Sequence, residues 1–323
     1  MVGLTGATGH IGSVLLRRLL ADPDVGQIRT VARRPLSPDP VGGPPDRLVH
    51  TLADLGHPSA RQALDGVDLL FHLAAQVWQG RSSRGLEQMY AANVEGTRNV
   101  ARARAGALVF ASSAAVYGAW PDNPLPMDEG HEPRPNIECA YAVQKLVAER
   151  TCVTEGPRHV IVRLSAVLGA HADARVAKAV RGYRLAVPAV TRAAQAVQWL
   201  DEGDAAEGLL AAGRALVNGG DADGEVVNLA PADWLEAHDV AALAGSRVVE
   251  LPRRTMVTGA EVGRRLGFSP FGADRAVLIT GPLALSASKA DRLLGWKATS
   301  TSADVLAAAL GNDWHSLPRN RQL

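Results

Sequence analysis

The sequence predicts an α/β fold built on a doubly wound parallel sheet, and three observations support this prediction. A glycine-rich turn at residues 5–12 follows a short apolar start and opens directly into a helical pattern. Apolar runs suited to buried strands then alternate with helical patterns through the first half of the chain. From about residue 169 the alternation loosens into short helices, prolines and small strands, which indicates a smaller second unit.

The first half contains five further strand-like runs, separated by helical or turn signals. The runs are residues 27–32, 47–52, 67–73, 107–111 and 159–164, with helical patterns at about 11–21, 59–64, 85–104 and 141–154. The Pro- and Gly-rich segment 35–45 predicts a surface loop. In the second half, residues 204–217 predict a helix with Asp204 as its N-cap, and residues 226–229 predict a strand.

The composition excludes several classes of protein. The 323 residues are 47% hydrophobic and 21% charged, as in ordinary soluble domains. The formal net charge of +1 provides no overall field for nucleic acid or a membrane surface. No apolar run reaches the roughly 18 residues of a membrane span, and no signal-peptide pattern is visible. Cys139 and Cys152 show neither a disulfide framework nor metal-ligand spacing, so we expect a cytoplasmic protein.

The glycine-rich turn predicts a dinucleotide site. Its glycines permit a tight turn, close approach of a ligand to the backbone and close helix–strand packing. The helix after the turn directs free N–H groups and the positive end of its dipole at an anion such as a pyrophosphate. The residues predicted to bind the cofactor here are Gly6, Thr8, Gly9, His10, Ile11 and Gly12.

The ends of the next strands extend the predicted cofactor site. No acidic residue follows the second strand, where it would bind a ribose 2′-hydroxyl, and Arg33 and Arg34 instead offer guanidinium groups for a 2′-phosphate. This favours NADP(H) over NAD, and the alternative is a pair of solvated loop arginines. Asp54 and Leu55 follow the third strand near the expected adenine, although a lone Asp there is usually a turn residue. The fourth strand ends in residues that leave room for a ribose: Leu73, Ala74 and Ala75.

The predicted helix 141–154 carries the chemistry. Tyr141 and Lys145 are four residues apart, so they share one helix face. A nearby ammonium is expected to lower the pKa of the phenol from about 10, which lets Tyr141 exchange a proton near neutral pH. The strand 107–111 leads into Ser112 and Ser113, where a hydroxyl can hydrogen-bond the same substrate oxygen. The predicted catalytic residues are therefore Tyr141, Lys145 and a serine at this strand end, and the family resemblance given below implies that the serine is Ser113.

Several further residues stand out from the patterns around them. Asn93 and Gly96 disfavour a helix interior, so we expect Asn93 to reach a neighbouring loop and Gly96 to permit close packing. Three aromatic residues follow strand ends, where they either face a substrate or simply pack: Trp78, Tyr117 and Trp120. Three histidines show no metal-ligand spacing, and we predict no metal site: His10, His72 and His171.

These motifs together resemble the extended branch of the short-chain dehydrogenase/reductase superfamily, over nearly the whole chain. Residues 5–12 resemble its TGxxGxxG turn, and Tyr141 and Lys145 resemble its YxxxK pair. Ser113 stands four residues before Tyr117 of a Val-Tyr-Gly signature, the position of the family's catalytic serine. Residues 288–296 resemble the branch's C-terminal Ser-Lys…Leu-Gly-Trp signature.

The resemblance implies a Rossmann-type dinucleotide-binding domain with a smaller, interleaved substrate domain. The first would span residues 1–168 with a return segment at about 199–230, and the second residues 169–198 and 231–323. Family members often dimerise through the helices that match 85–104 and 141–154, so a homodimer is one expectation. The resemblance also implies further cofactor contacts at Asn93, Ser112, Tyr141, Lys145, Leu164 and Ser165. It implies substrate contacts at Ser113, Tyr117 and Tyr141.

The leading functional hypothesis is an NADP(H)-dependent reductase that interconverts a ketone and a secondary alcohol on a small molecule. The Ala-, Arg- and Pro-rich composition is typical of GC-rich bacterial chains, in which such reductases often serve secondary metabolism. Two alternatives are a nucleotide-sugar epimerase or dehydratase with tightly bound NAD, and an NADP-sensing module without turnover. Ala166 replaces an asparagine common in nucleotide-sugar members, and Ala114 and Ala115 replace the Thr-Asp or Thr-Glu of sugar dehydratases. Both departures weaken a sugar-nucleotide assignment.

Overall fold

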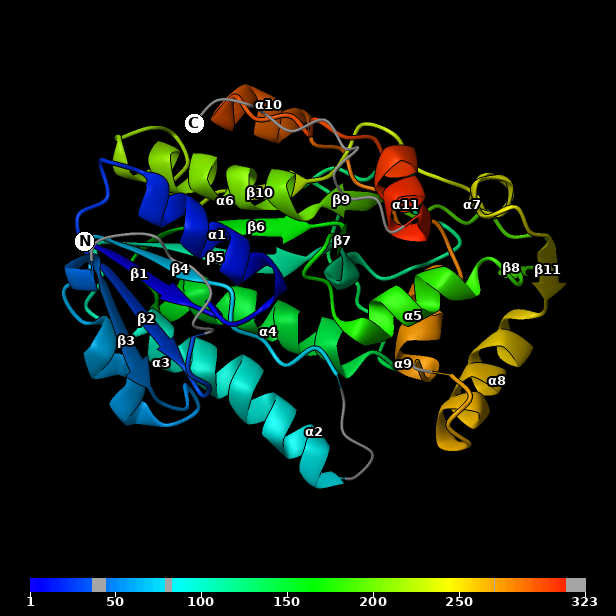
Figure 1. Ribbon diagram of the computed structural model, residues 1–323, viewed down its shortest axis with the longest axis horizontal. Coiled ribbons are helices and arrows are strands. Elements are labelled where there is room, and N and C mark those ends of the chain that lie inside the picture. Colours follow the sequence, from blue (N-terminus) through cyan, green and yellow to red (C-terminus); the bar gives the residue numbers. More distant parts are fainter. Residues whose placement is uncertain (37–44, 79–82, 270, 312–323) are drawn as a thin grey trace.

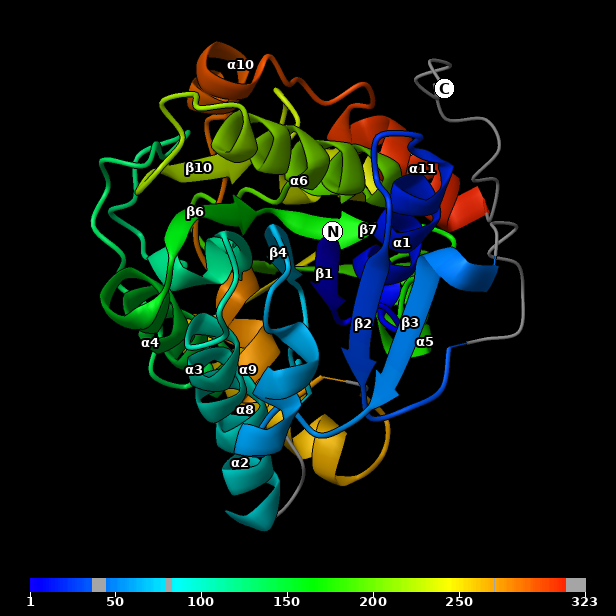
Figure 2. The ribbon, with the colours of Figure 1, turned by 90° about the vertical axis from the view of Figure 1, so that its left-hand side faces the viewer.

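The computed structural model describes residues 1–36, 45–78, 83–269 and 271–311, and its centre is a seven-stranded parallel sheet (Figures 1 and 2). The strand order β10-β6-β5-β4-β1-β2-β3 reverses direction at β1, which confirms the doubly wound fold. The strands are β1 (Val2–Thr5), β2 (Ile28–Ala32), β3 (Leu48–Leu52), β4 (Leu69–His72), β5 (Ala107–Ser113), β6 (Arg158–Leu164) and β10 (Val226–Leu229).

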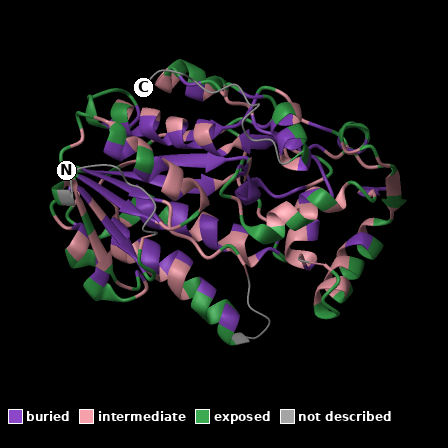
Figure 3. Ribbon diagram, viewed as in Figure 1, coloured by how far each residue is buried: buried purple, intermediate pink, exposed green. Residues whose placement is uncertain are grey.

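Helices cover both faces of this sheet. One face packs against α1 (His10–Ala21), α6 (Glu202–Val217) and α10 (Ser288–Leu294), and the other against α3 (Gly96–Ala101) and α4 (Ala140–Glu155). Figure 3 shows the strands buried between these two layers. Leu15 and Leu19 of α1 are 0% and 1% exposed, and each such side chain contributes about 1.5–3 kcal/mol of burial energy.

The predicted helix 85–104 is interrupted. It forms α2 (Ser83–Tyr90), a π-helical turn (Ala91–Glu95) and α3. Asn93 lies in the π-helical turn, and a β-carbon added at Gly96 would stand 3.3 Å from Leu55 Cβ, so both residues are placed as expected. The N-cap of α6 is Asp201 rather than Asp204, because the Asp201 carboxylate accepts from the amides of residues 203 and 204.

The second half builds its own hydrophobic core at the end of the main sheet (Figure 1). This core includes Leu168, Trp199 and Leu306, and the chain leaves it to add α6, β10 and α10 to the main sheet. The elements here are β7 (Ala166–Leu168), α5 (Ala174–Gly182), β8 (Val187–Val190), β9 (Trp199–Asp201), α7 (Ala237–Ala244), β11 (Val248–Leu251), α8 (Arg253–Arg265), α9 (Ala273–Ala276) and α11 (Ser302–Gly311). The domain boundaries expected from the sequence, at residues 168, 198 and 230, stay a prediction.

Two findings bear on the sequence-based expectations for the surface. Most of the predicted loop 35–45 lies outside the described residues, as does the C-terminal end of the segment 231–323. Within the described ranges, no helix is both long enough and apolar enough to cross a membrane.

Candidate active site

The glycine-rich turn between β1 and α1 leaves no room for a side chain at Gly6 or Gly12. Gly6 has φ +79°, and a β-carbon there would stand 2.7 Å from the amide nitrogen of Ala74. A β-carbon on Gly12 would stand only 2.0 Å from the carbonyl oxygen of Gly6. Gly9 is the N-cap of α1, and no side chain caps the helix. The turn therefore fits a pyrophosphate, because the first-turn amides beside Thr8, His10 and Ile11 keep their N–H groups for an anion.

The strand ends around this turn are arranged as the sequence predicts, and their side chains differ in availability. Arg33 and Arg34 are exposed, and neither side chain forms a hydrogen bond or ion pair with another described residue. Asp54 is exposed and its carboxylate accepts from the amide of Gly56 at 2.9 Å, as a turn residue does. Leu55 is buried against Gly96. The backbone of Leu73 and Ala74 lies directly against Gly6, and Leu73, Ala74 and Ala75 are all half-buried.

Asn93 clamps the loop after β4 to helix α4. Its side-chain oxygen accepts from the amide of Gln76 at 2.7 Å, and its nitrogen donates to the carbonyl of Gln76 and to Gln144 Oε1, both at 2.9 Å. Asn93 is 2% exposed. Its side chain is therefore fully used inside the protein, and its part in a cofactor site is to hold the loop at Gln76 in place.

A buried hydrogen-bond chain that the sequence did not reveal joins β1, β4 and the π-helical turn. His72 is fully buried between Thr5 Oγ1 at 2.6 Å and Thr97 Oγ1 at 3.0 Å. Since the Thr97 hydroxyl donates to the carbonyl of Asn93, it accepts from His72 Nε2, and Thr5 donates to His72 Nδ1. Burial, helped by the charge of Lys145, lowers the pKa of His72 to about 3. The imidazole is therefore neutral.

The two serines at the end of β5 have different partners. Ser112 is buried and donates to Glu149 Oε1 at 2.5 Å. Ser113 is half-buried, accepts from the amide of Ala115 at 3.2 Å and lies near enough to Tyr141 for its hydroxyl to lower the pKa of the phenol. The structure thus brings together the hydroxyl and the phenol that the sequence places in one site.

The residues after β6 complete this edge of the sheet. Leu164 is buried in the main core. Ser165 is 5% exposed, and its hydroxyl has no hydrogen-bond partner among the described residues. A buried hydroxyl without a partner is costly, so Ser165 fits a polar group of a bound cofactor.

Lys145 does not occupy its predicted position beside the phenol. Its ammonium donates to the carbonyl of Ala111 at 2.6 Å and lies 4.5 Å from the ring centre of Phe110. Burial lowers the pKa of Lys145 to about 8. The predicted direction for the phenol is also wrong, because burial raises the pKa of Tyr141 despite the nearby charge of Arg275 and the hydrogen bond from Ser113.

Tyr117 is corrected from a substrate contact to a buried structural residue. Its ring is 0% exposed. Its hydroxyl donates to Asn228 at 3.1 Å and accepts from Arg163 at 2.8 Å. Arg163 also donates to Glu149 through two bonds, at 2.7 and 3.0 Å, which closes a buried polar network behind the site.

His10 belongs to a second cluster at the start of α1. Its Nε2 lies 2.8 Å from Glu202 Oε2, and His171 Nδ1 lies 2.6 Å from Glu202 Oε1. Burial alone would raise the pKa of Glu202, but hydrogen bonds from both histidines lower it. The cluster ties the glycine-rich turn to α6 and to the loop after β7. The described residues hold no group of three side chains placed to bind a metal ion.

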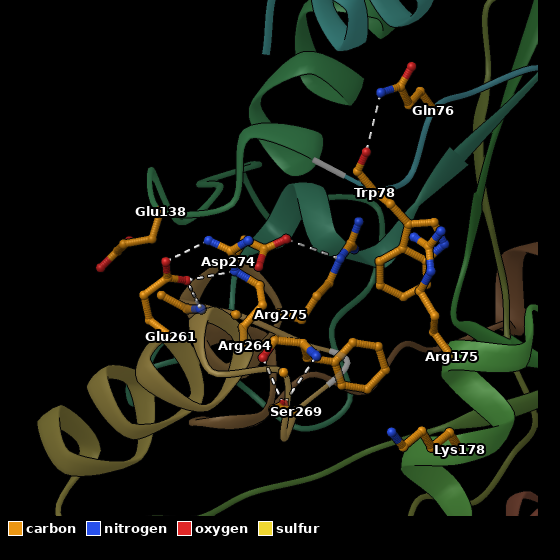
Figure 4. Close-up of a pocket in the computed structure, with 14 residues that line it drawn as sticks. Gln76, Trp78, Glu138, Arg175, Lys178, Glu261, Arg264, Ser269, Asp274 and Arg275 are labelled. Carbon is orange, nitrogen blue, oxygen red and sulfur yellow. Dashed lines mark hydrogen bonds and ion pairs between the residues drawn. The ribbon is translucent and has the colours of Figure 1, made fainter. Parts of the chain in front are cut away.

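A cavity of about 650 Å³ opens between the loop after β4 and the second half of the chain (Figure 4). Tyr141 is not among its lining residues, but Arg275, which lines it, lies over the Tyr141 ring. Trp78 lines the cavity and stacks on Phe271, with ring centres 5.4 Å apart. Four cationic side chains also line it: Arg175, Lys178, Arg264 and Arg275. Glu261 neutralises Arg264 at 2.6 Å. Trp120 takes no part, since its indole donates to the carbonyl of Arg134.

Comparison with known proteins agrees with this geometry. The model of the NAD dependent epimerase/dehydratase family matches residues 2–230. The chain belongs to this family. Family membership makes it an enzyme that uses a nicotinamide cofactor, and the sequence-based recognition is confirmed.

Two curated relatives cover different shares of the chain. The uncharacterized protein y4nG of Sinorhizobium fredii is 25% identical over 306 residues, which is 91% of this chain and 73% of that protein. Sterol demethylase protein B of Methylococcus capsulatus is 32% identical over 173 residues. That match spans only about half of each protein, 51% in both cases.

Solved structures share the fold over nearly the whole chain. MoeE5 in complex with UDP-glucuronic acid and NAD has a TM-score of 0.72 at 21% identity, covering 98% of this chain and 99% of that one. UDP-galactose 4-epimerase has a TM-score of 0.69 at 24% identity and covers 98% of each chain. The dTDP-glucose 4,6-dehydratase DesIV from Streptomyces venezuelae has a TM-score of 0.72 at 21% identity, covering 97% and 96%.

Proposed function

We propose that this enzyme epimerises a secondary carbinol on a sugar carried by a nucleoside diphosphate, and that it keeps its NAD bound between turnovers. The observation that supports this most is the placement of Ser113 beside Tyr141 at the carboxyl edge of the sheet, with Arg275 lying over the Tyr141 ring and lining the neighbouring cavity. UDP- and dTDP-sugar enzymes with the same fold agree with it. This reverses the order of the sequence-based hypotheses, in which a ketone reductase came first.

The chain's own groups perform the proton transfer. A bound nicotinamide supplies the hydride acceptor and donor. Ser113 Oγ donates a hydrogen bond to the substrate oxygen, and Tyr141 Oη takes the hydroxyl proton as the carbonyl forms and returns it as the alcohol re-forms. The oxidation half-reaction runs from the phenolate form of Tyr141, and the returning step runs from the phenol. Since burial raises the pKa of Tyr141, the phenol predominates at neutral pH and only the phenolate fraction starts the oxidation.

The cavity favours an anionic substrate with a flat group. Arg175 and Lys178 of α5 and Arg275 of α9 supply positive charge, which Asp173 beside Arg175 and Asp274 beside Arg275 offset in part. Trp78 and Phe271 supply stacked ring faces. A diphosphate and a nucleobase need these two kinds of partner. Within the family's chemistry, Ala114 and Ala115 argue against a dehydratase, because elimination of water requires an acid that these alanines do not provide.

A net ketone reductase that uses NADPH is the second candidate. It is favoured by Arg33 and Arg34, whose exposed side chains have no partner among the described residues. One experiment separates the two candidates. Purified protein is denatured and its released cofactor quantified, and the native protein is then incubated with UDP- and dTDP-sugars or with ketones and NADPH. We expect stoichiometric NAD and epimer formation without net NADPH consumption.

Replacement of Tyr141 tests the site itself. Tyr141→Phe is expected to lower the rate by about 100-fold or more, within the range of general acid–base catalysis. Tyr183→Phe serves as a matched control, because it removes a phenol hydroxyl from the second core, away from the cavity. Protein that carries no bound NAD and oxidises NADPH in the presence of a ketone would instead establish the reductase. The Michaelis constants for NADPH and NADH would then be compared between wild type and Arg33→Ala. Near-normal turnover by Tyr141→Phe would exclude both mechanisms.

A further inference from the structure

Arg275 lies between the phenol and the cavity. It comes from α9 in the second half of the chain, and its side chain is 14% exposed. Its guanidinium carbon lies 4.8 Å from the ring centre of Tyr141 and 5.3 Å from that of Trp78. It also donates to the carbonyl of Val77. These contacts hold a cation over the face of the tyrosine ring.

Lys145, the expected cation, points elsewhere. Its ammonium hydrogen-bonds the carbonyl of Ala111 and rests on the ring of Phe110, within the body of the sheet. Cys152, a buried neighbour on the same helix, and Glu149 are the groups that act on it electrostatically. The cation that contacts the tyrosine ring is therefore supplied by an element far away in the sequence.

We propose that Arg275 is a positioning residue for proton transfer, whose guanidinium stabilises the phenolate left when Tyr141 gives its proton to the substrate oxygen. The proposal rests on the proposed function only in taking Tyr141 as the proton carrier. In that step the Tyr141 O–H bond breaks, an O–H bond forms on the substrate, and the negative charge stays on the phenol. This charge spreads into the ring, so a cation over the ring face attracts the anion more than the neutral phenol.

The other groups around Tyr141 do not replace Arg275. Burial raises the pKa of Tyr141, and the charge of Arg275 is the largest influence that lowers it. Ser113 on β5 lowers the pKa further by its hydrogen bond, and Cys139, just before α4, raises it. Asp274 lies 3.6 Å from Arg275 Nε and offsets part of its charge.

Titration of the tyrosinate absorbance on the full chain without substrate tests the proposal. The chain has four tyrosines, and the difference between wild type and Tyr141→Phe isolates the one of interest. Arg275→Met is expected to raise the midpoint of Tyr141 by about one pH unit or more, the usual effect of losing an opposite charge at this distance. Arg275→Lys is expected to stay closer to wild type.

Arg175→Met is the matched control. The guanidinium carbon of Arg175 lies 5.0 Å from the Trp78 ring centre, and that of Arg275 lies 5.3 Å from the same centre. Unlike Arg275, Arg175 does not lie over the Tyr141 ring. Its tyrosine titration is expected to match wild type. Arg275→Gln replaces Arg275→Met if the latter does not fold, as judged by thermal melting.

Two outcomes would overturn the proposal: an unchanged Tyr141 midpoint without Arg275, or an equal shift in Arg175→Met. A larger shift in Lys145→Met than in Arg275→Met would also assign the role to Lys145. The titration needs no turnover. An inactive protein with the expected shift would therefore remove the proposed function and leave the electrostatic role of Arg275 standing.

Discussion

At the scale of single residues, local spacing predicts which side chains lie near one another but not the surroundings of each. Ser113 and Tyr141 meet as the motif predicts, because one strand end and one helix face fix their relation. The protonation behaviour of Tyr141 depends instead on burial and on Arg275, which belongs to a part of the chain without a readable pattern. Lys145 likewise turns inward to a backbone carbonyl that no spacing rule identifies.

His72 gives a pH-dependent prediction at this scale. Its pKa is about 3 in the folded chain against 6.5 when exposed, so between these values the unfolded chain binds a proton that the folded chain does not. Stability is therefore fully present above pH 6.5 and falls as the pH drops toward 3, by up to about 1.4 kcal/mol per pH unit.

Urea unfolding at a series of acidic pH values would measure this slope. His72→Gln retains hydrogen-bonding groups but does not titrate in this range, and we expect its stability to fall less steeply with acid. The variant is also expected to be less stable above pH 6.5, because it disturbs the bonds to Thr5 and Thr97. Parallel slopes in the two proteins would show that His72 is not the group responsible.

At the scale of elements, the alternating pattern predicted the strands of the main sheet well, because each buried parallel strand is a short apolar run. The break in the helix 85–104 was predicted less well. Asn93 and Gly96 marked an irregularity, but the π-helical turn depends on contacts with Gln76 and Gln144, which lie on other elements. Sequence spacing within one helix does not contain that information.

Asn93→Ala tests the energetic weight of this turn. The change removes three hydrogen bonds and leaves the amide and carbonyl of Gln76 without their partner. We expect a loss of about 2–4 kcal/mol in the free energy of unfolding, since each unsatisfied buried polar group costs about 1–3 kcal/mol.

Asn99→Ala in α3 is the matched control, because the Asn99 side chain makes one bond, to the carbonyl of Leu55 at 2.7 Å. Its expected loss is about 1 kcal/mol. Chemical denaturation of both variants would give the two values. Equal losses would mean that the π-helical turn is not held by Asn93.

At the scale of the whole molecule, buried polar contacts tie α6, which packs on the main sheet, to the segment that leads into α11 of the second core. Asp204 of α6 is 6% exposed, and its carboxylate accepts from the amide and hydroxyl of Thr299 and the amide of Ser300 at 2.7–3.1 Å. The indole of Trp296 donates to the backbone carbonyl of Asp204. The sequence predicted a return segment here but gave Asp204 the role of a helix cap. Its role as an anchor depends on residues more than ninety positions later.

We therefore expect the two cores to unfold in a single cooperative transition, because α6, β10 and α10 pack on the main sheet while Trp199 and Leu306 hold the second core directly beside them. Asp204→Ala should lower the stability of the whole chain by about 3 kcal/mol, since hydrogen bonds to a charged group contribute about 1.5–3 kcal/mol each. Circular dichroism and tryptophan fluorescence, followed through the same denaturation, should shift together. Asp233→Ala should shift them less, because among the described residues the Asp233 carboxylate accepts one hydrogen bond, from the amide of Ser302. Two separate transitions in the wild-type protein would mean that the halves fold independently and that the Asp204 contacts only dock one on the other.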